Sequence, residues 1–114
     1  SPHVVPLPYS VEANVDPEEA FIASISSCRM LFFLSIAAKN KLVIESYEDK
    51  AEGIMEKDTQ GNISITKVTL KPKVVFAAHT QPAYELLEKI HHQAHQQCFI
   101  ANSVKAEIVT EIVE

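Results

Sequence analysis

Two cysteines, Cys28 and Cys98, are the residues best suited to redox chemistry in this chain of 114 residues. A thiolate that attacks an oxidant becomes a sulfenic acid, and a second thiol nearby condenses with that acid to form a disulfide. Free cysteine is also among the most buried residue types and often only fills space. The spacing alone therefore leaves both a redox pair and two structural thiols open.

Three side chains that can bind zinc share one face of a predicted helix. They are His91, His95 and Cys98, at positions i, i+4 and i+7. A structural zinc site needs four ligands, so Cys28 or His79 would have to supply the fourth. Histidines that only pack or face solvent fit the same pattern, and we expect no metal and no cofactor. The carboxylates resemble solvated faces, so nothing indicates paired-carboxylate catalysis.

Cys28 lies in a segment predicted to be helical from residue 16 to about residue 39 or 40. Asp16 suits the N-cap, Pro17 the first helical position and Glu19 the acidic place of a capping box. The following stretch has neither Gly nor Pro and is apolar nearly all round, as in a buried core helix. A membrane span is the alternative, but Arg29 near its centre would cost about 2.5 to 3.5 kcal/mol. We therefore expect no membrane insertion.

A β-hairpin is predicted after this helix. Residues 42–57 favour a strand, residues 58–62 have turn chemistry, and residues 63–70 alternate cleanly between apolar and polar side chains. The second strand is expected to continue to residue 76, which places Pro72 at a bulge or an edge.

A second helix and a last strand complete the pattern. Thr80 is predicted to cap a helix over residues 82–98, which puts Cys98 at its C-terminal end. Residues 103–113 alternate as a final strand. Residues 1–14 contain three prolines and are expected to be extended, with little regular structure.

This order of elements predicts one α+β domain over residues 1–114, with mostly antiparallel connectivity. Three strands make a thin sheet for so apolar a helix, so we expect either strands upstream of residue 1 or a second subunit to complete the core. The start without Met suggests a trimmed product, and the lack of a signal-peptide pattern favours the cytoplasm. A net charge of -5 with no basic run predicts no nucleic-acid partner.

Two segments carry a resemblance to a known family. Residues 16–28 read DPEEAFIASISSC, which resembles the PEELxxAAxxxC helix of the OsmC/Ohr family, and residues 97–103 read QCFIANS, which resembles that family's second cysteine segment. The resemblance extends over residues 15 to 113. It implies an OsmC-like fold: a long buried central helix, an antiparallel sheet and a second helix with a cysteine, in an intertwined homodimer with active sites at the interface.

The same resemblance implies a function. Cys28 would attack an organic hydroperoxide, Cys98 would resolve the product to a disulfide, and a dithiol or lipoyl-type reductant would reopen it. Glu18 matches the family glutamate that holds an activating arginine. That arginine normally lies in N-terminal strands and has no equivalent here, so either it lies upstream of residue 1 or a residue such as Arg29 substitutes for it. The alternative is a non-enzymatic OsmC-like stress-response protein that binds a small ligand.

Overall fold

The computed structural model describes residues 16–114, so the lead-in predicted for residues 1–14 lies outside the described residues. The helix that contains Cys28 is α2, Pro17–Lys39. Asp16 occupies its N-cap, Pro17 its first turn and Asn40 its C-cap, which confirms the predicted bounds. One side of α2 is buried, whereas Leu31 on another side is 61% exposed.

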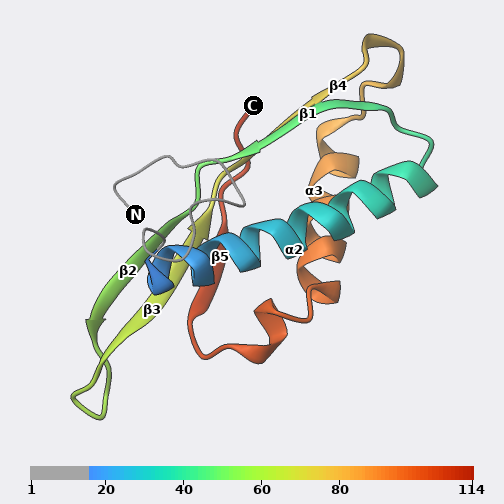
Figure 1. Ribbon diagram of the computed structural model, residues 1–114. Helices are drawn as coiled ribbons and strands as arrows, with labels where there is room; N and C mark the ends of the chain where they lie inside the picture. Colours follow the sequence, from blue (N-terminus) through green and yellow to red (C-terminus); the bar gives the residue numbers. More distant parts are fainter. Residues whose placement is uncertain (1–15) are drawn as a thin grey trace.

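A long, bent antiparallel hairpin follows α2 (Figure 1). Each predicted strand is divided in two, which gives β1 (Ile44–Asp49) and β2 (Glu52–Lys57) in one arm, and β3 (Ile63–Leu70) and β4 (Pro72–Phe76) in the other. β1 pairs with β4, and β2 pairs with β3. The breaks fall between β1 and β2 and at Lys71, because Asp49 accepts the Lys71 backbone N–H at 2.7 Å instead of leaving it to the ladder.

The hairpin turn has the predicted chemistry. One carboxylate oxygen of Asp58 accepts hydrogen bonds from the backbone N–H groups of Gln60 at 2.9 Å and Asn62 at 3.0 Å. Gly61 has a φ of 82°, a conformation that side chains with a Cβ rarely adopt. These features fix the register of the long arms.

The last strand, β5 (Glu107–Thr110), is shorter than predicted and runs parallel to β3. The antiparallel prediction is therefore confirmed for the hairpin and wrong for this ladder. A short 3₁₀-helix, Ala101–Ser103, ends at the first residue of the stretch predicted as strand. The parallel pairing follows because the chain crosses from one end of the sheet to the other through the second helix before it enters β5.

The second helix, α3, spans Tyr84–Gln97 and has Ala83 at its N-cap, so the prediction that Thr80 caps it was wrong. Thr80 instead ends a 3₁₀-helix, Ala78–Thr80. Its hydroxyl accepts a hydrogen bond from the backbone N–H of Val43 at 3.1 Å. The Thr80 side chain therefore joins this turn to the start of β1.

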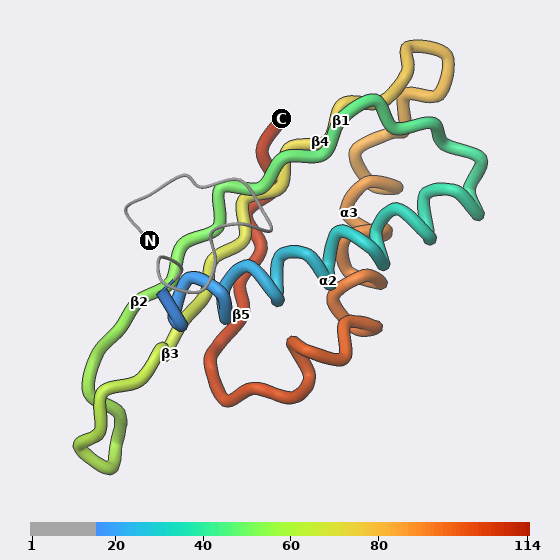
Figure 2. Tube along the Cα trace, in the orientation of Figure 1, coloured from blue at the N-terminus to red at the C-terminus, as the bar shows by residue number. Residues whose placement is uncertain are grey.

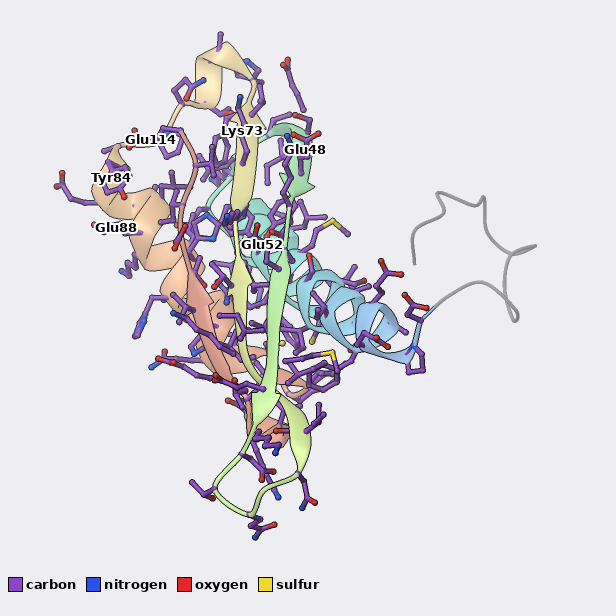
Figure 3. All side chains as sticks on the ribbon, turned by 90° about the vertical axis from the view of Figure 1, so that its left-hand side faces the viewer. Glu48, Glu52, Lys73, Tyr84, Glu88 and Glu114 are labelled. Atoms are coloured by element: carbon purple, nitrogen blue, oxygen red, sulfur yellow. The ribbon has the colours of Figure 1, made fainter. Side chains whose placement is uncertain are left out.

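Two hydrophobic clusters hold the helices to the strands, and Figure 2 shows α2 crossing both the strands and α3. One cluster joins α2, α3 and β4 and contains Phe33, Ile36, Ala37, Phe76, Ile90 and Ala94. The other joins α2 to β3 and contains Ile25, Val68 and Leu70. In Figure 3 the strands run vertically, with α2 to their right and α3 to their left.

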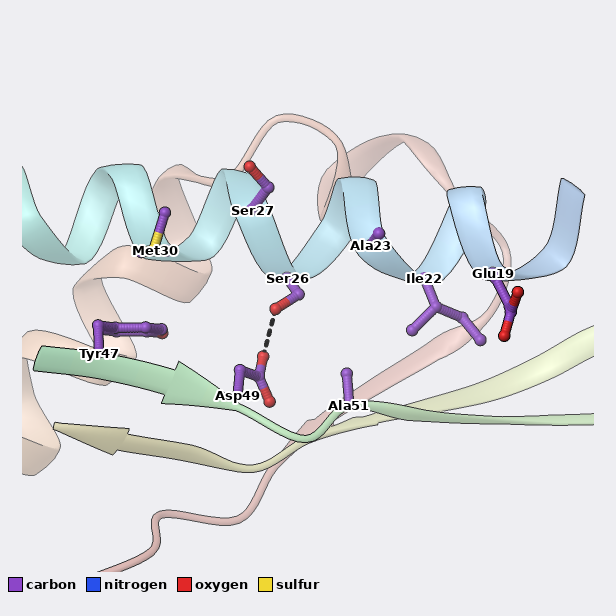
Figure 4. A pocket seen from close by; sticks show the side chains of 9 residues that line it. All are labelled: Glu19, Ile22, Ala23, Ser26, Ser27, Met30, Tyr47, Asp49 and Ala51. Atoms are coloured by element: carbon purple, nitrogen blue, oxygen red, sulfur yellow. Dashed lines mark hydrogen bonds between the residues drawn. The ribbon is translucent and has the colours of Figure 1, made fainter. Parts of the chain in front are cut away.

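A groove of about 430 Å³ separates α2 from β1, and a polar contact bridges it (Figure 4). The Ser26 hydroxyl donates to Asp49 at 2.5 Å. Because the other Asp49 oxygen binds the Lys71 backbone, this carboxylate ties α2 to both arms of the hairpin. Burial, with the nearby Asp49 charge, raises the pKa of Tyr47 in this groove to about 12.

By length and composition alone, α2 is apolar enough to cross a membrane. Core helices of soluble proteins and signal sequences meet the same criterion. α2 contributes to both hydrophobic clusters and buries Arg29 against α3, so we interpret it as a core helix.

Candidate functional site

The structure brings Cys28 and Cys98 together. Cys28 lies on the face of α2 that is buried, and Cys98 is the C-cap of α3. The two thiols are free and in hydrogen-bonding contact with each other. The Cys98 sulfur also accepts the backbone N–H of Ala101 at 3.5 Å. The two sulfurs therefore meet, although 70 residues separate them in the sequence.

Cys28 faces an apolar cavity of about 460 Å³. Its apolar wall is formed by Leu31, Phe32, Phe99 and Ile100. The rings of Phe32 and Phe99 meet edge to face, with centroids 5.6 Å apart. Cys98 is not part of this wall and is fully buried, so Cys28 is the thiol that a molecule in the cavity would meet first.

Of the three phenylalanines within seven positions of Cys28 in the sequence, only one lines this cavity. Phe32 does so, whereas Phe33 belongs to the cluster with α3 and β4, and Phe21 packs on the cluster with β3. The helical repeat explains the difference, since neighbouring positions on a helix point about 100° apart. Proximity to Cys28 in the sequence therefore does not identify the side chains that line this cavity.

Burial raises the pKa of the Cys98 thiol, and its hydrogen bond with Cys28 raises it further. The buried position of Cys98 therefore disfavours its thiolate form. The two backbone N–H groups beyond the end of α3, of Ile100 and Ala101, oppose this shift.

Arg29, the only arginine in the sequence, is buried between α2 and α3 with 1% of its surface exposed. Its Nη1 lies 3.2 Å from Nδ1 of His95, and its Nη2 donates to the backbone carbonyl of His91 at 3.3 Å. Burial lowers the pKa of the guanidinium, whereas nearby negative charge, including that of either cysteine as a thiolate, raises it. Arg29 therefore places a buried positive charge near both sulfurs.

The zinc hypothesis gains no support from the geometry. Among residues 16–114, no three His, Cys, Asp or Glu side chains converge in a way that could hold a metal ion. The guanidinium of Arg29 lies against His95, where a cation would have to bind, and Cys98 contacts Cys28 rather than the histidines.

Comparisons with known proteins agree with the family resemblance of the two cysteine segments. A family model described as "OsmC-like protein" matches residues 11–113. The chain belongs to the OsmC-like family. The predicted family and α+β fold class are confirmed, because known members share the fold. Among curated proteins, none matches this chain in sequence.

Several solved structures are similar to this OsmC-like protein. An OsmC-like protein of unknown function from Vibrio cholerae O1 biovar eltor is 62% identical, with a TM-score of 0.87 over 99% of this chain and 73% of that chain. The organic hydroperoxide resistance protein OhrB of Bacillus subtilis is 19% identical, with a TM-score of 0.73 over 90% and 73%. An organic hydroperoxide resistance protein from Elizabethkingia anophelis is 17% identical, with a TM-score of 0.70 over 90% and 69%. The last two likenesses concern the fold alone.

Glu18, the third residue of the predicted site, is not beside the thiols within this OsmC-like chain. It is half-buried in the first turn of α2, ten residues before Cys28. A helix rises about 1.5 Å per residue, which separates the two backbone positions by about 15 Å along the axis. Its role as a holder of an arginine stays a prediction from the resemblance.

His91 is expected to make this OsmC-like protein less stable in mild acid. Burial and the nearby Arg29 lower the pKa of His91 to about 4 in the folded protein, below the usual 6.5. The unfolded chain therefore binds a proton first as the pH falls from 6.5 to 4, and this site loses about 3 kcal/mol of folding free energy over that range.

Urea unfolding at a series of pH values measures this effect. We expect His91→Gln to show a smaller loss of unfolding free energy between pH 6.5 and pH 4 than the wild type. His79→Gln is the matched control, since His79 is exposed. Equal pH dependence in the wild type and His91→Gln would contradict the prediction.

Proposed function

We propose that this OsmC-like protein is a thiol-dependent peroxidase that reduces organic hydroperoxides. The observation that supports it most is the contact between two free thiols, one of which faces an apolar cavity of about 460 Å³. A cavity with one wall of aliphatic and aromatic side chains suits the organic part of a hydroperoxide better than a strongly hydrated oxidant. Relatives of the same fold are named as organic hydroperoxide resistance proteins.

The proposed reaction uses both sulfurs. The Cys28 thiolate attacks the terminal oxygen of ROOH, the O–O bond breaks, and the departing alkoxide takes a proton and leaves as an alcohol. Cys28 is then a sulfenic acid, and the Cys98 sulfur attacks it to form a disulfide and release water. A dithiol, such as a lipoyl-type reductant, reduces the disulfide by exchange and returns both thiols.

Arg29 is the proposed source of the positive charge that this chemistry needs. A thiolate forms more readily beside a cation, and burial otherwise opposes its formation. Arg29 is buried, and its charge interacts with both cysteines. We therefore assign it the activating role for which the family uses an arginine elsewhere in the chain.

Thiol titration of the reduced protein, before and after one equivalent of cumene hydroperoxide, tests the function. Read with intact mass, a peroxidase should lose both thiols rapidly and about 2 Da as the disulfide forms. Two thiols that stay unreacted would instead favour the second candidate, a protein that binds a small ligand without turnover.

That second candidate rests on a specific observation. Both thiols are buried, and burial raises the pKa of Cys98, which are properties of structural cysteines as well. In that case the cavity beside Cys28 would hold an apolar ligand, and the cysteines would serve only to pack the helices together.

We propose further that two copies associate through the rim of the Cys28 cavity. Leu31 is 61% exposed and Phe99 is 63% exposed, so a single chain presents large apolar side chains at this rim. Sedimentation equilibrium should give about twice the chain mass of 12.7 kDa. Leu31→Glu should lower that mass, and a monomeric wild type at micromolar concentration would contradict the proposal.

The need for a thiol reductant fits a cytoplasmic location.

A further inference from the structure

Two nearly perpendicular aromatic rings form a corner in the wall of the cavity beside Cys28. Phe32 comes from α2, and Phe99 directly follows Cys98, the C-cap of α3. The planes of the two rings meet at 86°, and their centroids are 5.6 Å apart. The two rings therefore bring α2 and the end of α3 together at the cavity, as the two thiols do.

A corner of this kind suits a third flat ring. Aromatic pairs prefer the offset-stacked and the edge-to-face arrangements. A ring that lies offset and parallel to one wall of a perpendicular corner is edge-on to the other wall, so it makes both preferred contacts at once. A saturated group of the same size has no π-system and gains only its hydrophobic burial. The corner therefore favours an aromatic ligand over an alkyl one.

The corner is fixed by its backbone, although residues 16–114 leave much of it uncovered. Phe99 is 63% exposed. Its carbonyl accepts the Ser103 hydroxyl at 2.7 Å, and the carbonyl of Cys98 accepts the backbone N–H of Asn102 at 3.0 Å. Phe32 is half-buried on the long helix α2. Side chains that are positioned in advance lose little freedom when a ligand binds.

The corner also lies close to the attacking sulfur. Phe32 is four residues after Cys28, so the two side chains lie on the same face of α2, with about 6 Å between their backbone positions along the axis. Side chains on a helix lean toward its N-terminus, so Phe32 leans toward the turn that contains Cys28. A ligand ring in this corner therefore suits a peroxide group on the carbon next to that ring.

The cavity gives no charged partner to its ligand. Among residues 16–114, no charged side chain lines it, and its other polar side chains are three serines of α2 (Ser24, Ser27 and Ser35). A serine hydroxyl both donates and accepts hydrogen bonds, which suits a neutral peroxide or alcohol group. We therefore expect the part of the ligand inside the cavity to be uncharged.

We propose that Phe32 and Phe99 form an aryl-binding subsite, which selects neutral hydroperoxides whose –OOH carbon carries an aromatic ring over purely alkyl ones. The subsite rests on the proposed peroxidase function, since it names the substrates that the same cavity would accept. The ring does not react: Cys28 is oxidised as described above, the O–O bond is reduced, and the ring leaves as part of the alcohol.

Binding of two alcohols to the reduced protein tests the subsite without any turnover. The probes are 2-phenyl-2-propanol, the alcohol formed from cumene hydroperoxide, and 2-cyclohexyl-2-propanol, which has a saturated ring in the same place. In an NMR titration, the wild type should bind the phenyl compound about two- to tenfold more tightly. Equal or tighter binding of the cyclohexyl compound to the wild type would overturn the proposal.

Three leucine variants assign that preference to the corner. Phe32→Leu and Phe99→Leu each keep an apolar side chain but remove one ring, so each should lose the preference for the phenyl compound. Phe99→Leu changes an exposed position and serves alone if Phe32→Leu does not fold. Phe21→Leu is the matched control, because Phe21 also lies on α2 but packs on the cluster with β3, and it should keep the preference. An undiminished preference in both corner variants would count against the subsite.

Oxidation rates with two hydroperoxides separate the subsite from the peroxidase function. tert-Butyl hydroperoxide differs from cumene hydroperoxide only by a methyl group in place of the phenyl ring. Phe32→Leu and Phe99→Leu should slow oxidation by cumene hydroperoxide about two- to tenfold and leave the rate with tert-butyl hydroperoxide unchanged. Equal slowing with both peroxides would mean that the rings act on the thiols or the fold, and would contradict the subsite. If neither peroxide oxidises the wild type, the peroxidase function fails, and a preference for the phenyl alcohol would still support an aryl-binding cavity.

Discussion

Replacement of Cys28 by serine is expected to abolish oxidation of the protein by cumene hydroperoxide, whereas replacement of Cys98 should leave one oxidation per chain. A serine hydroxyl is not a nucleophile at neutral pH without a base to activate it, so Cys28→Ser has no group that can attack the O–O bond. Cys98→Ser retains that group but cannot form the internal disulfide. Its Cys28 should stop as a sulfenic acid, a gain of about 16 Da.

Intact mass after one equivalent of peroxide, without added reductant, distinguishes the three proteins. The wild type should lose mass, Cys98→Ser should gain it, and Cys28→Ser should not change. Circular dichroism of each variant controls for loss of fold. If Cys98 in Cys28→Ser took up one oxygen at the wild-type rate, the two roles would be reversed, and the assignment of Cys28 as the attacking thiol would be contradicted.

The assignment of these roles follows from position more than from sequence. Cys28 borders the apolar cavity, whereas Cys98 is fully buried behind it at the end of α3. An organic hydroperoxide in the cavity would therefore reach Cys28 first. The sequence alone could place the two cysteines on two helices, but it could not tell which sulfur faces a cavity, because that depends on how the helices cross.

The parts of the fold that were predicted correctly depend on local chemistry. Pro17 lies in the first turn of α2, and Asp58 and Gly61 form the hairpin turn, because each acts within its own few residues. The parts that were missed depend on distant partners. Thr80 binds Val43 instead of capping α3, and β5 pairs with β3 in parallel. No pattern within either segment indicates those partners.

Arg29 is the site residue whose place was hardest to predict. A charged residue in the middle of an apolar helix argues against a membrane, but it does not indicate burial. Two features of the sequence could have suggested it: Arg29 is one turn from the buried positions Ile25 and Phe33, and His91 and His95 share a face of the second helix. The structure joins them through hydrogen bonds of 3.2 and 3.3 Å.

The second large effect is expected from Arg29→Met, which should slow the oxidation of Cys28 without destabilising the fold. Methionine keeps an unbranched apolar stem but removes a buried charge that has no ion-pair partner among residues 16–114, so the free energy of unfolding should stay the same or rise by about 1 kcal/mol. An opposite charge nearby commonly shifts a pKa by about 1 to 3 units. Loss of the cation should therefore slow thiol oxidation at pH 7 at least tenfold.

Arg29→Lys is the matched variant for this prediction, because it preserves the charge but not the planar guanidinium. We expect it to recover part of the lost rate, and we expect the pH profile of thiol alkylation to move to higher pH in Arg29→Met and less so in Arg29→Lys. Urea unfolding measures stability in the same three proteins.

A slower and less stable Arg29→Met protein would mean that Arg29 holds α2 and α3 together, since a structural role lowers both quantities. An unchanged oxidation rate with an unchanged pH profile would mean that Cys28 is activated by some other group. Only a slower oxidation rate with undiminished stability agrees with the proposed role. In that role, burial of the Arg29 charge lowers the stability of the fold but activates the thiol pair.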